Sequence, residues 1–338
     1  MKIGDILNIE PTLEATSGLG TVGPIRSRVI YIHPAGRYYT VEFCNPITGE
    51  RWREAFWPEL APHFKAVGAA VRGSNQGGKV NMKTIAVLNF KGGVGKTVTT
   101  ATLAYLLAKQ GKRILLIDGD SQGNLSMSFG IDAEEGADTL ALLTEGAGYY
   151  PEFVTPTIFD GIDLIPSDIN LLVADRHMAQ SGVGRMQRAI ADLRDAIEED
   201  ADQDNAYDLI LIDCPPALSA ACTAALAAAD EVIIPIRLDY YSTGGMANLA
   251  EQLQHMRAIN SRLSVLGVLV TQFTHMADEK EALAAIRGGA LPVFETVIRF
   301  SKAVPSATFQ KVPLPVARPY CAASKDYAEL VKEISGRC

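Results

Sequence analysis

The sequence predicts an α/β protein in which a mainly parallel, twisted sheet is flanked by helices and preceded by a small all-β domain. Three patterns lead to this prediction. Apolar runs such as residues 114–117, within the predicted strand 113–117, are continuous, as in strands that are buried on both faces of a parallel sheet. Alanine- and leucine-rich stretches such as residues 98–110 alternate with these runs and indicate helices. Residues 1–66 instead contain short alternating strands between polar turns.

The N-terminal domain, residues 1–66, is expected to be a small SH3-like barrel with strands at residues 4–10, 28–32, 38–43 and 50–56. It contains no nucleophile–base pair and no metal-ligand spacing, so its expected role is regulation or partner binding. Five arginines either form a basic face for nucleic acid or lie on solvated strand faces. They are Arg26, Arg28, Arg37, Arg51 and Arg53.

Residues 67–81 are predicted to be a flexible linker, because glycine and small polar residues dominate the stretch from 73 to 78. Residues 82–338 then contain the elements of a complete α/β domain. Strands are expected at residues 84–90, 113–117, 207–213, 231–236, 263–271 and 293–298, with helices at 98–110 and 219–229. The tail, residues 326–338, is expected to be a last helix that packs on the sheet.

Size, composition and cysteine usage limit the class of protein. A chain of 338 residues with 48% hydrophobic and 21% charged residues favours a soluble protein of two domains. We find no signal sequence and no run of about eighteen apolar residues, so we expect a cytoplasmic protein that does not span a membrane. The five cysteines are scattered without a C-x-x-C pair, which favours reduced thiols over disulfides or zinc.

The net charge of −8 is unevenly distributed along the chain. Residues 1–81 hold nine Lys/Arg and seven Asp/Glu, whereas the remaining residues hold 22 and 32. An acidic second domain is not what a strong, whole-surface DNA binder would contain. We therefore expect any DNA binding to be weak and sensitive to salt.

Residues 90–97 form a predicted phosphate-binding loop between a buried strand and a helix. They follow the pattern G-x-x-x-x-G-K-[ST], except that Phe90 occupies the first glycine position. Lys96 would reach the β- and γ-phosphates of a nucleotide, and the Thr97 hydroxyl would ligate Mg²⁺. Glycines let backbone N–H groups turn toward phosphate oxygens, and the following helix presents its N-terminus to them. These glycines are Gly92, Gly93 and Gly95.

Carboxylates follow two of the predicted strands. Asp118 and Asp120 come directly after residues 113–117, and Asp213 ends the apolar run that starts at residue 209. Open α/β sheets bind ligands at the carboxyl ends of their strands, so these acids are expected beside the phosphate loop. A turn or helix-cap role is the alternative explanation of the cluster at residues 118–124.

Three motifs carry a family resemblance that extends over residues 82–334. Residues 91–97, K-G-G-V-G-K-T, resemble the deviant Walker A loop of the ParA/MinD ATPases. Residues 118–124 resemble that family's D-x-D-P-Q-G-N switch, with Ser121 where proline is usual, and residues 213–216 match its D-C-P-P sequence. The resemblance implies a P-loop NTPase fold, with ATP and Mg²⁺ as cofactors.

The resemblance also implies roles for individual residues. Lys91 would reach across a nucleotide-sandwich homodimer to the partner's ATP, Lys96 would bind the phosphates, and Asp120 would orient or activate the attacking water. Asp118 would support the metal–water network. The residues expected to contact the metal are Thr97, Asp213 and Asp120. Those expected to bind the cofactor are Gly92, Gly93, Val94, Gly95, Lys96, Thr97, Val98, Asp118, Asp213 and Pro305.

Further segments are interpreted through the resemblance. Residues 303–315 resemble a turn near the nucleotide base, although a proline-stiffened surface loop explains Pro305 equally well. Residues 238–245 resemble an acidic-aromatic segment of the dimer face. The family often has a DNA-contacting arginine after the strand that ends near Thr271, and residues 272–276 contain none. Arg299 and Lys302 keep positive charge in a second DNA-associated segment.

The favoured interpretation is a ParA-like partition ATPase, associated with the nucleoid, that dimerises on ATP binding and acts with a ParB-like adaptor on DNA. A MinD-like membrane-positioning ATPase would need a basic, bulky amphipathic tail, which residues 326–338 lack. A relative of the nitrogenase iron protein would need cluster-ligating cysteines at a dimer axis. A positioning ATPase for a protein assembly, or a conjugative transfer factor, shares the same motifs and stays open.

Overall fold

The computed structural model describes most of the chain. The described residues are 6–9, 25–32, 39–44, 51–56, 82–134, 136–146, 150–181, 184–200, 206–238 and 251–337. The chain divides into two compact units, residues 1–79 and 80–338.

The first unit contains a four-stranded antiparallel sheet in the order β1-β2-β3-β4. Its strands are β1 (Ile6–Ile9), β2 (Ile25–Ile32), β3 (Tyr39–Cys44) and β4 (Arg51–Phe56). They lie where the alternating pattern predicted strands. The connections, the linker predicted at residues 67–81 and the side chains of the five arginines lie outside the described residues. The SH3-like barrel therefore stays a prediction.

The second unit is built on a seven-stranded sheet in the order β11-β10-β5-β9-β6-β8-β7. Neighbouring strands pair in parallel, except that β7 and β8 are antiparallel. The strands are β5 (Lys83–Val87), β6 (Ile114–Asp118), β7 (Thr155–Pro156), β8 (Ile162–Ile165), β9 (Leu209–Asp213), β10 (Glu231–Arg237) and β11 (Ser264–Thr271). The predicted mainly parallel sheet is confirmed.

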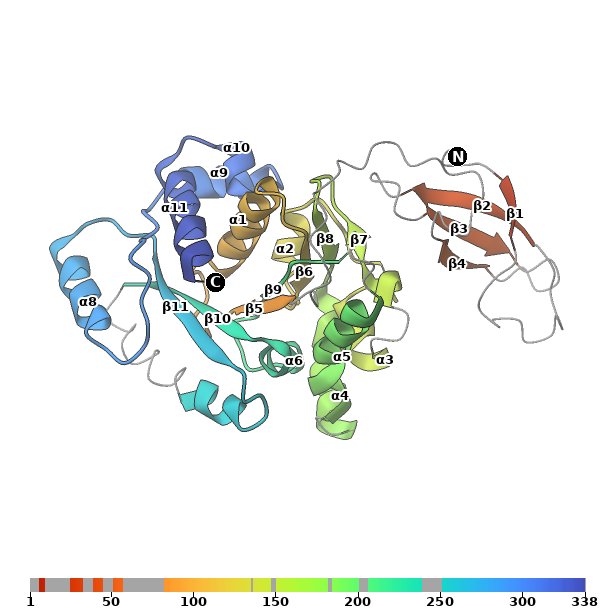
Figure 1. The fold of residues 1–338 in the computed structure, drawn as a ribbon, viewed down its shortest axis with the longest axis horizontal. Helices are drawn as coiled ribbons and strands as arrows, with labels where there is room; N and C mark the ends of the chain where they lie inside the picture. The colour runs from red at the N-terminus through yellow and green to blue at the C-terminus, as the bar shows by residue number, and fades with distance from the viewer. Residues whose placement is uncertain are drawn as a thin grey trace, which may run out of the picture. The chain divides into compact units, whose positions relative to one another are not determined.

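Helices cover both faces of this sheet (Figure 1). One face carries α1 (Lys96–Lys109), α9 (Ala303–Phe309), α10 (Leu314–Ala317) and α11 (Ala322–Arg337). The other carries α3 (Thr139–Glu145), α4 (Leu172–Ser181), α5 (Gly184–Asp200) and α6 (Ala220–Ala228). Shorter or peripheral elements are α2 (Asn124–Met127), α8 (Ala277–Arg287) and the 3₁₀ turns η2 (Tyr150–Phe153) and η3 (Ile169–Leu171).

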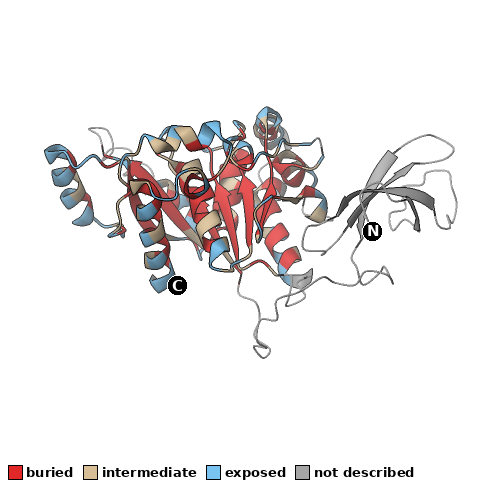
Figure 2. Cartoon of the chain, turned by 90° about the horizontal axis from the view of Figure 1, so that it is seen from above, coloured by how far each residue is buried: buried red, intermediate tan, exposed pale blue. Residues whose placement is uncertain are grey.

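Successive side chains of the central strands pack into two separate apolar layers, one on each face of the sheet. In β5, Ile85 and Val87 belong to the layer that includes α1 and α11, whereas Ala86 belongs to the layer that includes α5 and α6. The strands are buried, and the exposed residues lie on the outer surfaces of the helices (Figure 2). Side chains of consecutive strand residues point to opposite faces of a sheet. A sheet that is covered by helices on both faces therefore needs the continuous apolar runs seen in the sequence.

The last helix packs on the sheet as the sequence predicted. Tyr327, Leu330 and Ile334 of α11 are buried in the same layer as α1. The Tyr327 hydroxyl also lies 2.9 Å from the Thr99 hydroxyl of α1, which ties the two helices together. Within the described residues, none of the helices has the length and apolar character needed to cross a membrane.

Two local predictions are wrong. In the described chain, residues 293–298 form no strand. Val293 makes an isolated bridge with Val268 of β11, and beyond both segments Phe273 makes a second bridge with Arg299. The fully buried Phe294 packs its ring against Gly267, where an added Cβ would lie 2.6 Å from a ring carbon. Backbone hydrogen bonds still join this segment to β11, from the Phe294 N–H to the Val268 carbonyl and from the Ile298 N–H to the Val270 carbonyl. Residues 303–315, predicted as a turn, contain α9 and the start of α10.

Candidate active site

The phosphate loop joins the end of β5 to the start of α1. Gly93 (φ 72°) and Gly95 (φ 87°) have left-handed backbone conformations, which residues with a Cβ rarely adopt. Gly95 is the N-cap residue, so α1 begins directly at Lys96. Val94 is buried and anchors the loop, whereas a Cβ on Gly92 or Gly93 would meet no atom within 4 Å. The loop therefore has an open side next to a helix N-terminus, which suits a phosphate group.

Lys96 is held at this loop in a largely buried position. Its side chain donates from Nζ to the carbonyl oxygen of Lys91 at 3.1 Å, which keeps the ammonium group over the loop. Burial lowers the pKa of Lys96, while the charges of Asp213 and Asp120 oppose this shift. A phosphate in the loop would restore the charge balance around the ammonium group, because it brings negative charge to a desolvated cation.

Thr97 and Asp213 form a pair of oxygen ligands from two different elements. The Thr97 hydroxyl donates to Asp213 Oδ2 at 2.6 Å, and the Thr100 hydroxyl lies 3.5 Å from Asp213 Oδ1. Burial raises the pKa of Asp213 well above its usual range, and the nearby Asp118 carboxylate adds to this shift. A buried carboxylate beside a hydroxyl is an arrangement that a divalent cation would stabilise.

These residues fit Mg²⁺, which prefers hard oxygen ligands and keeps several waters of its own. The described residues contain no group of three or more His, Cys, Asp or Glu side chains arranged to hold a metal ion. Thr97 and Asp213 would therefore hold the ion together with water and phosphate oxygens. When bound, the ion would neutralise charge on the phosphates.

Asp118 holds the predicted switch segment, residues 118–124, and the helix after it through hydrogen bonds of its carboxylate. Its carboxylate is fully buried, and Oδ2 accepts hydrogen bonds from the backbone N–H and hydroxyl of Ser126 at 2.8 and 2.7 Å. Oδ1 accepts from the backbone N–H of Asp120 at 3.2 Å. Burial raises the pKa of Asp118 to about 6, and the hydrogen bonds from Ser126 and Asp120 oppose that shift. The predicted role of Asp118 in a metal–water network stays a prediction.

Asp120 lies at the surface end of the same segment. Its Oδ1 accepts from the backbone N–H of Gln122 at 3.0 Å, so the residue caps a turn. Strand pairing aligns Asp118 with Asp213, which places the start of the predicted switch, residues 118–124, next to a predicted metal ligand. The turn and the catalytic explanation are therefore compatible, and the water-activating role of Asp120 stays a prediction.

Three residues outside the phosphate-loop motif hold the loop, and the sequence did not single them out. Asn89 donates from Nδ2 to the Pro235 carbonyl at 2.8 Å and accepts from the Lys91 N–H at 2.9 Å. The Thr271 hydroxyl donates to the Val94 carbonyl at 2.8 Å. Gln272 donates from Nε2 to the Gly93 carbonyl at 2.6 Å. No local pattern marks these residues, because the contacts of Thr271 and Gln272 depend on which strands lie beside the loop.

The other predicted site residues lie in several places. Lys91 is exposed on the loop, and Val98 is half-buried in α1, within the layer next to the sheet. Pro305 is exposed in α9, so its predicted contact with the base stays a prediction. Arg299 binds Asp326 through two nitrogens, with Nη2 at 2.6 Å, and Lys302 is exposed. Residues 239–245 of the predicted dimer-face segment lie outside the described residues.

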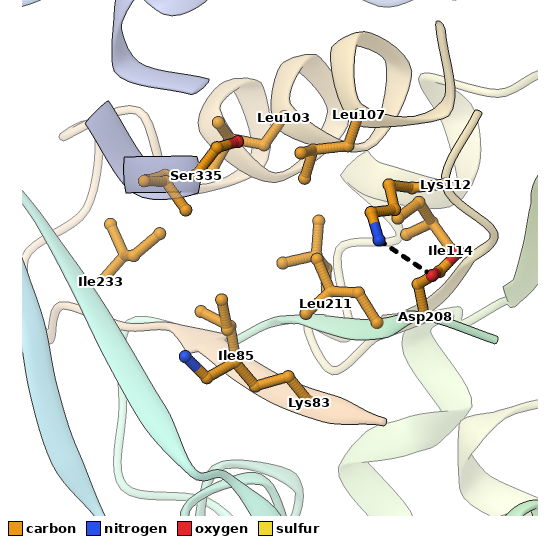
Figure 3. A pocket seen from close by; sticks show the side chains of 12 residues that line it. Lys83, Ile85, Leu103, Leu107, Lys112, Ile114, Asp208, Leu211, Ile233 and Ser335 are labelled. Carbon is orange, nitrogen blue, oxygen red and sulfur yellow. Dashed lines mark hydrogen bonds and ion pairs between the residues drawn. The ribbon is translucent and has the colours of Figure 1, made fainter. Parts of the chain in front are cut away.

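The second unit also has a cavity of about 480 Å³ at the amino ends of the central strands β5, β9 and β6, whereas the phosphate loop follows the carboxyl end of β5. Figure 3 shows the side chains that line this cavity. Lys83, Ile114 and Leu209, each the first residue of a strand, contribute to its lining. The remaining walls are mostly aliphatic, and Lys112 pairs with Asp208 at 3.0 Å. A smaller cavity of about 420 Å³ borders the turn after Asp120. The glycines, lysine and threonine of the phosphate loop do not line the first cavity, so the loop stays the predicted nucleotide site.

Comparisons with known proteins identify relatives of this chain. A family model described as an AAA domain matches residues 82–265. The chain is 36% identical over 264 residues to the chromosome-partitioning ATPase Soj of Thermus thermophilus, covering 77% of this chain and 98% of Soj. It is 32% identical over 259 residues to the chromosome partitioning protein ParA of Caulobacter vibrioides, covering 76% of this chain and 95% of that protein.

A solved structure supports the cofactors. Cobyrinic acid a,c-diamide synthase from Mycobacterium smegmatis, with a bound ATP analogue and magnesium, resembles this chain with a TM-score of 0.59 and 26% sequence identity. The match covers 74% of this chain and 93% of the synthase. The fold and the loop therefore define a P-loop ATPase that uses ATP and Mg²⁺. Within that class, the chain belongs to the ParA-type ATPases of the ParA/MinD family.

Proposed function

We propose that this ATPase is a dimerising switch of a DNA partition system. The observation that carries the proposal is the presence of two lysines with different surroundings at one loop. Lys96 is buried and directed at the loop of its own subunit, whereas Lys91 is exposed on the same loop. An exposed lysine at a complete ATP site suits a role toward the ATP of a second subunit.

In this proposal, ATP favours the homodimer and hydrolysis releases it. Each ATP would be held by Lys96 and the Mg²⁺ ligands of one subunit and approached by Lys91 of the other. The charge on the γ-phosphate would then be offset from both sides. Asp120 would orient the attacking water. A ParB-like adaptor would stimulate a slow basal reaction, and the dimer would act in the cytoplasm on the nucleoid.

The DNA component of the proposal rests on the named relatives and on a small basic surface. Soj and ParA are both described as chromosome-partitioning proteins. Lys302 is exposed, and Arg299 presents a partly exposed guanidinium group beside Asp326. Few cations predict few phosphate contacts, and therefore weak, non-specific affinity that falls as salt rises.

The test is DNA binding in defined nucleotide states. Asp120→Ala should retain ATP and keep the dimer, so it supplies a stable ATP state for the measurement. We expect a 60-base-pair duplex of random sequence to bind this variant with ATP at about 50 mM salt, to bind several-fold less at about 200 mM, and not to bind with ADP. Equal binding with ATP, with ADP and without nucleotide would contradict the proposal, as would wild-type hydrolysis by Asp120→Ala.

A second candidate is a positioning ATPase whose track or cargo is a protein assembly. The acidic balance of residues 82–338 and the ion pair between Arg299 and Asp326 favour it, because both reduce the positive charge available to DNA. ATP-dependent dimerisation without any nucleotide-dependent DNA binding would favour this candidate over DNA partition.

A further inference from the structure

Two consecutive residues at the end of β11 hold two consecutive carbonyl groups of the phosphate loop. The Thr271 hydroxyl donates to the Val94 carbonyl at 2.8 Å, and the Gln272 side chain donates to the Gly93 carbonyl at 2.6 Å. Strand β10 lies between β11 and β5, the strand that precedes the loop. The loop therefore extends across one strand to be held by the next.

These two contacts orient the donors that phosphate needs. In a planar trans peptide, the carbonyl of one residue and the N–H of the next point in opposite directions. Holding the Gly93 carbonyl toward Gln272 therefore turns the Val94 N–H away from β11. Holding the Val94 carbonyl toward Thr271 does the same for the Gly95 N–H. Both N–H groups belong to the loop that cradles phosphates.

Gln272 adopts an unusual backbone conformation to make its contact. Its φ of 54° lies in the left-handed region, which costs a non-glycine residue about 1 kcal/mol or more. The surroundings maintain this conformation, because the neighbouring residues are paired on both sides. Thr271 pairs with Arg237 in the sheet, and the Phe273 N–H donates to the Ile298 carbonyl at 2.9 Å.

The residue after Gln272 is paired with the segment that carries the proposed DNA contacts. The Phe300 N–H donates to the Phe273 carbonyl at 2.9 Å, so the backbone of Phe273 binds on both sides of Arg299. Phe273 is buried, which limits independent movement of its backbone. Two contacts therefore connect Gly93 to Arg299: the hydrogen bond from Gln272 to the Gly93 carbonyl, and the backbone bridge between Phe273 and Arg299.

We propose that Gln272 is a positioning residue that orients the phosphate loop for ATP and links the state of the loop to the Arg299–Lys302 segment. The orienting part depends on the ATPase site alone. The linking part rests on the proposed function, because it assumes that this segment binds DNA.

The orienting part is tested with two substitutions of similar length. Gln272→Glu keeps the shape of the side chain but places a carboxylate against the Gly93 carbonyl, whereas Gln272→Lys keeps a donor. Binding of N-methylanthraniloyl-ATP with Mg²⁺ should weaken about tenfold in Gln272→Glu and less than about threefold in Gln272→Lys. KM for ATP should rise in Gln272→Glu while kcat changes little, because Asp120 is untouched.

Equal losses in the two variants would show that ATP binding does not depend on a side-chain donor at residue 272, and unchanged affinity in Gln272→Glu would show that the contact is irrelevant. Either result overturns the orienting role. Thermal unfolding of both nucleotide-free variants checks that they fold.

The linking part is measured as the ratio of DNA affinities with ATP and with ADP, using the same 60-base-pair duplex at saturating nucleotide. Gln272→Glu should reduce this ratio several-fold relative to the wild type, and an unchanged ratio overturns the link. A wild type that binds no DNA in either state contradicts the proposed DNA function and overturns the link, while the nucleotide measurements still decide the orienting role.

Discussion

Lys91 and Lys96 occupy one loop but differ in burial, and this difference predicts different effects of substitution. Lys96→Ala removes a buried ammonium group from the phosphate site, so nucleotide affinity should fall at least about tenfold. Lys91→Ala should leave nucleotide affinity within about threefold of the wild type. Titration with a fluorescent ATP analogue measures both values.

The same two variants separate binding from dimerisation. Light scattering after size-exclusion chromatography should detect an ATP-dependent dimer for the wild type and none for Lys91→Ala. Normal dimerisation of Lys91→Ala would contradict the role of this lysine toward a second subunit. The matched control is Lys302→Ala, which removes an exposed lysine outside the loop and should dimerise normally.

Asp118 predicts a pH dependence of stability for the nucleotide-free protein. Burial raises its pKa to about 6 in the folded chain, from an ordinary value of 3.8 for an aspartate side chain. Between these values the folded state holds a proton that the unfolded state has lost, so stability falls as pH rises from about 4 to about 6. Asp118 alone should make the protein about 1 kcal/mol less stable at pH 7 than at pH 5.

The measurement is the free energy of urea unfolding at pH 5, 6 and 7 for the wild type and for Asp118→Asn. Asp118→Asn removes the titrating carboxyl group. The free energy of unfolding of this variant should therefore depend less steeply on pH than that of the wild type, even if the variant is more or less stable at any single pH. Parallel curves for the two proteins would contradict the effect assigned to Asp118.

At the scale of elements, the packing of Phe294 on β11 depends on the absence of a side chain at Gly267. An added Cβ would lie 2.6 Å from the fully buried ring, so Gly267→Ala should destabilise the protein by about 1–3 kcal/mol. Gly336→Ala is the control, because a Cβ there meets nothing within 4 Å in α11. The control should be neutral or stabilising by up to about 1 kcal/mol. Urea unfolding of both variants tests the difference, and equal effects would contradict it.

Most elements were predictable from the sequence because their signals are local. The apolar runs of β5, β6, β9, β10 and β11 and the helical stretches of α1 and α6 lie within a few residues of the predicted positions. The strand predicted at residues 293–298 failed for a non-local reason. Its apolar residues fit a strand, but the way they meet β11 depends on residues far away in the sequence, such as Gly267, against which the Phe294 ring packs.

At the scale of the whole molecule, the ATPase site and the excess of positive charge belong to different parts of the chain. All predicted ATP and Mg²⁺ ligands lie in residues 82–338, which carry 22 basic and 32 acidic residues, against nine and seven in residues 1–81. Deleting residues 1–80 should therefore leave nucleotide affinity within about twofold and weaken DNA affinity about tenfold at low salt.

Fluorescent nucleotide titration and DNA binding at several salt concentrations measure the two effects of this deletion. Replacing Arg26, Arg28, Arg37, Arg51 and Arg53 with glutamine in the full chain is the matched control, and it should reproduce the loss of DNA affinity. Unchanged DNA affinity in the deletion would rule out a contribution from the arginines of the first unit.

The sequence was sufficient to predict the parallel sheet, the phosphate loop and the acids at Asp118, Asp120 and Asp213, because each follows from residues that are adjacent in the chain. Folding of the chain was needed to identify Gln272 as a partner of Gly93, since these residues are 179 positions apart. Their contact depends on β10 lying between β5 and β11 in the sheet. Periodicity indicates which residues are buried on a strand, but the order of strands and the backbone at φ 54° are set by long-range packing.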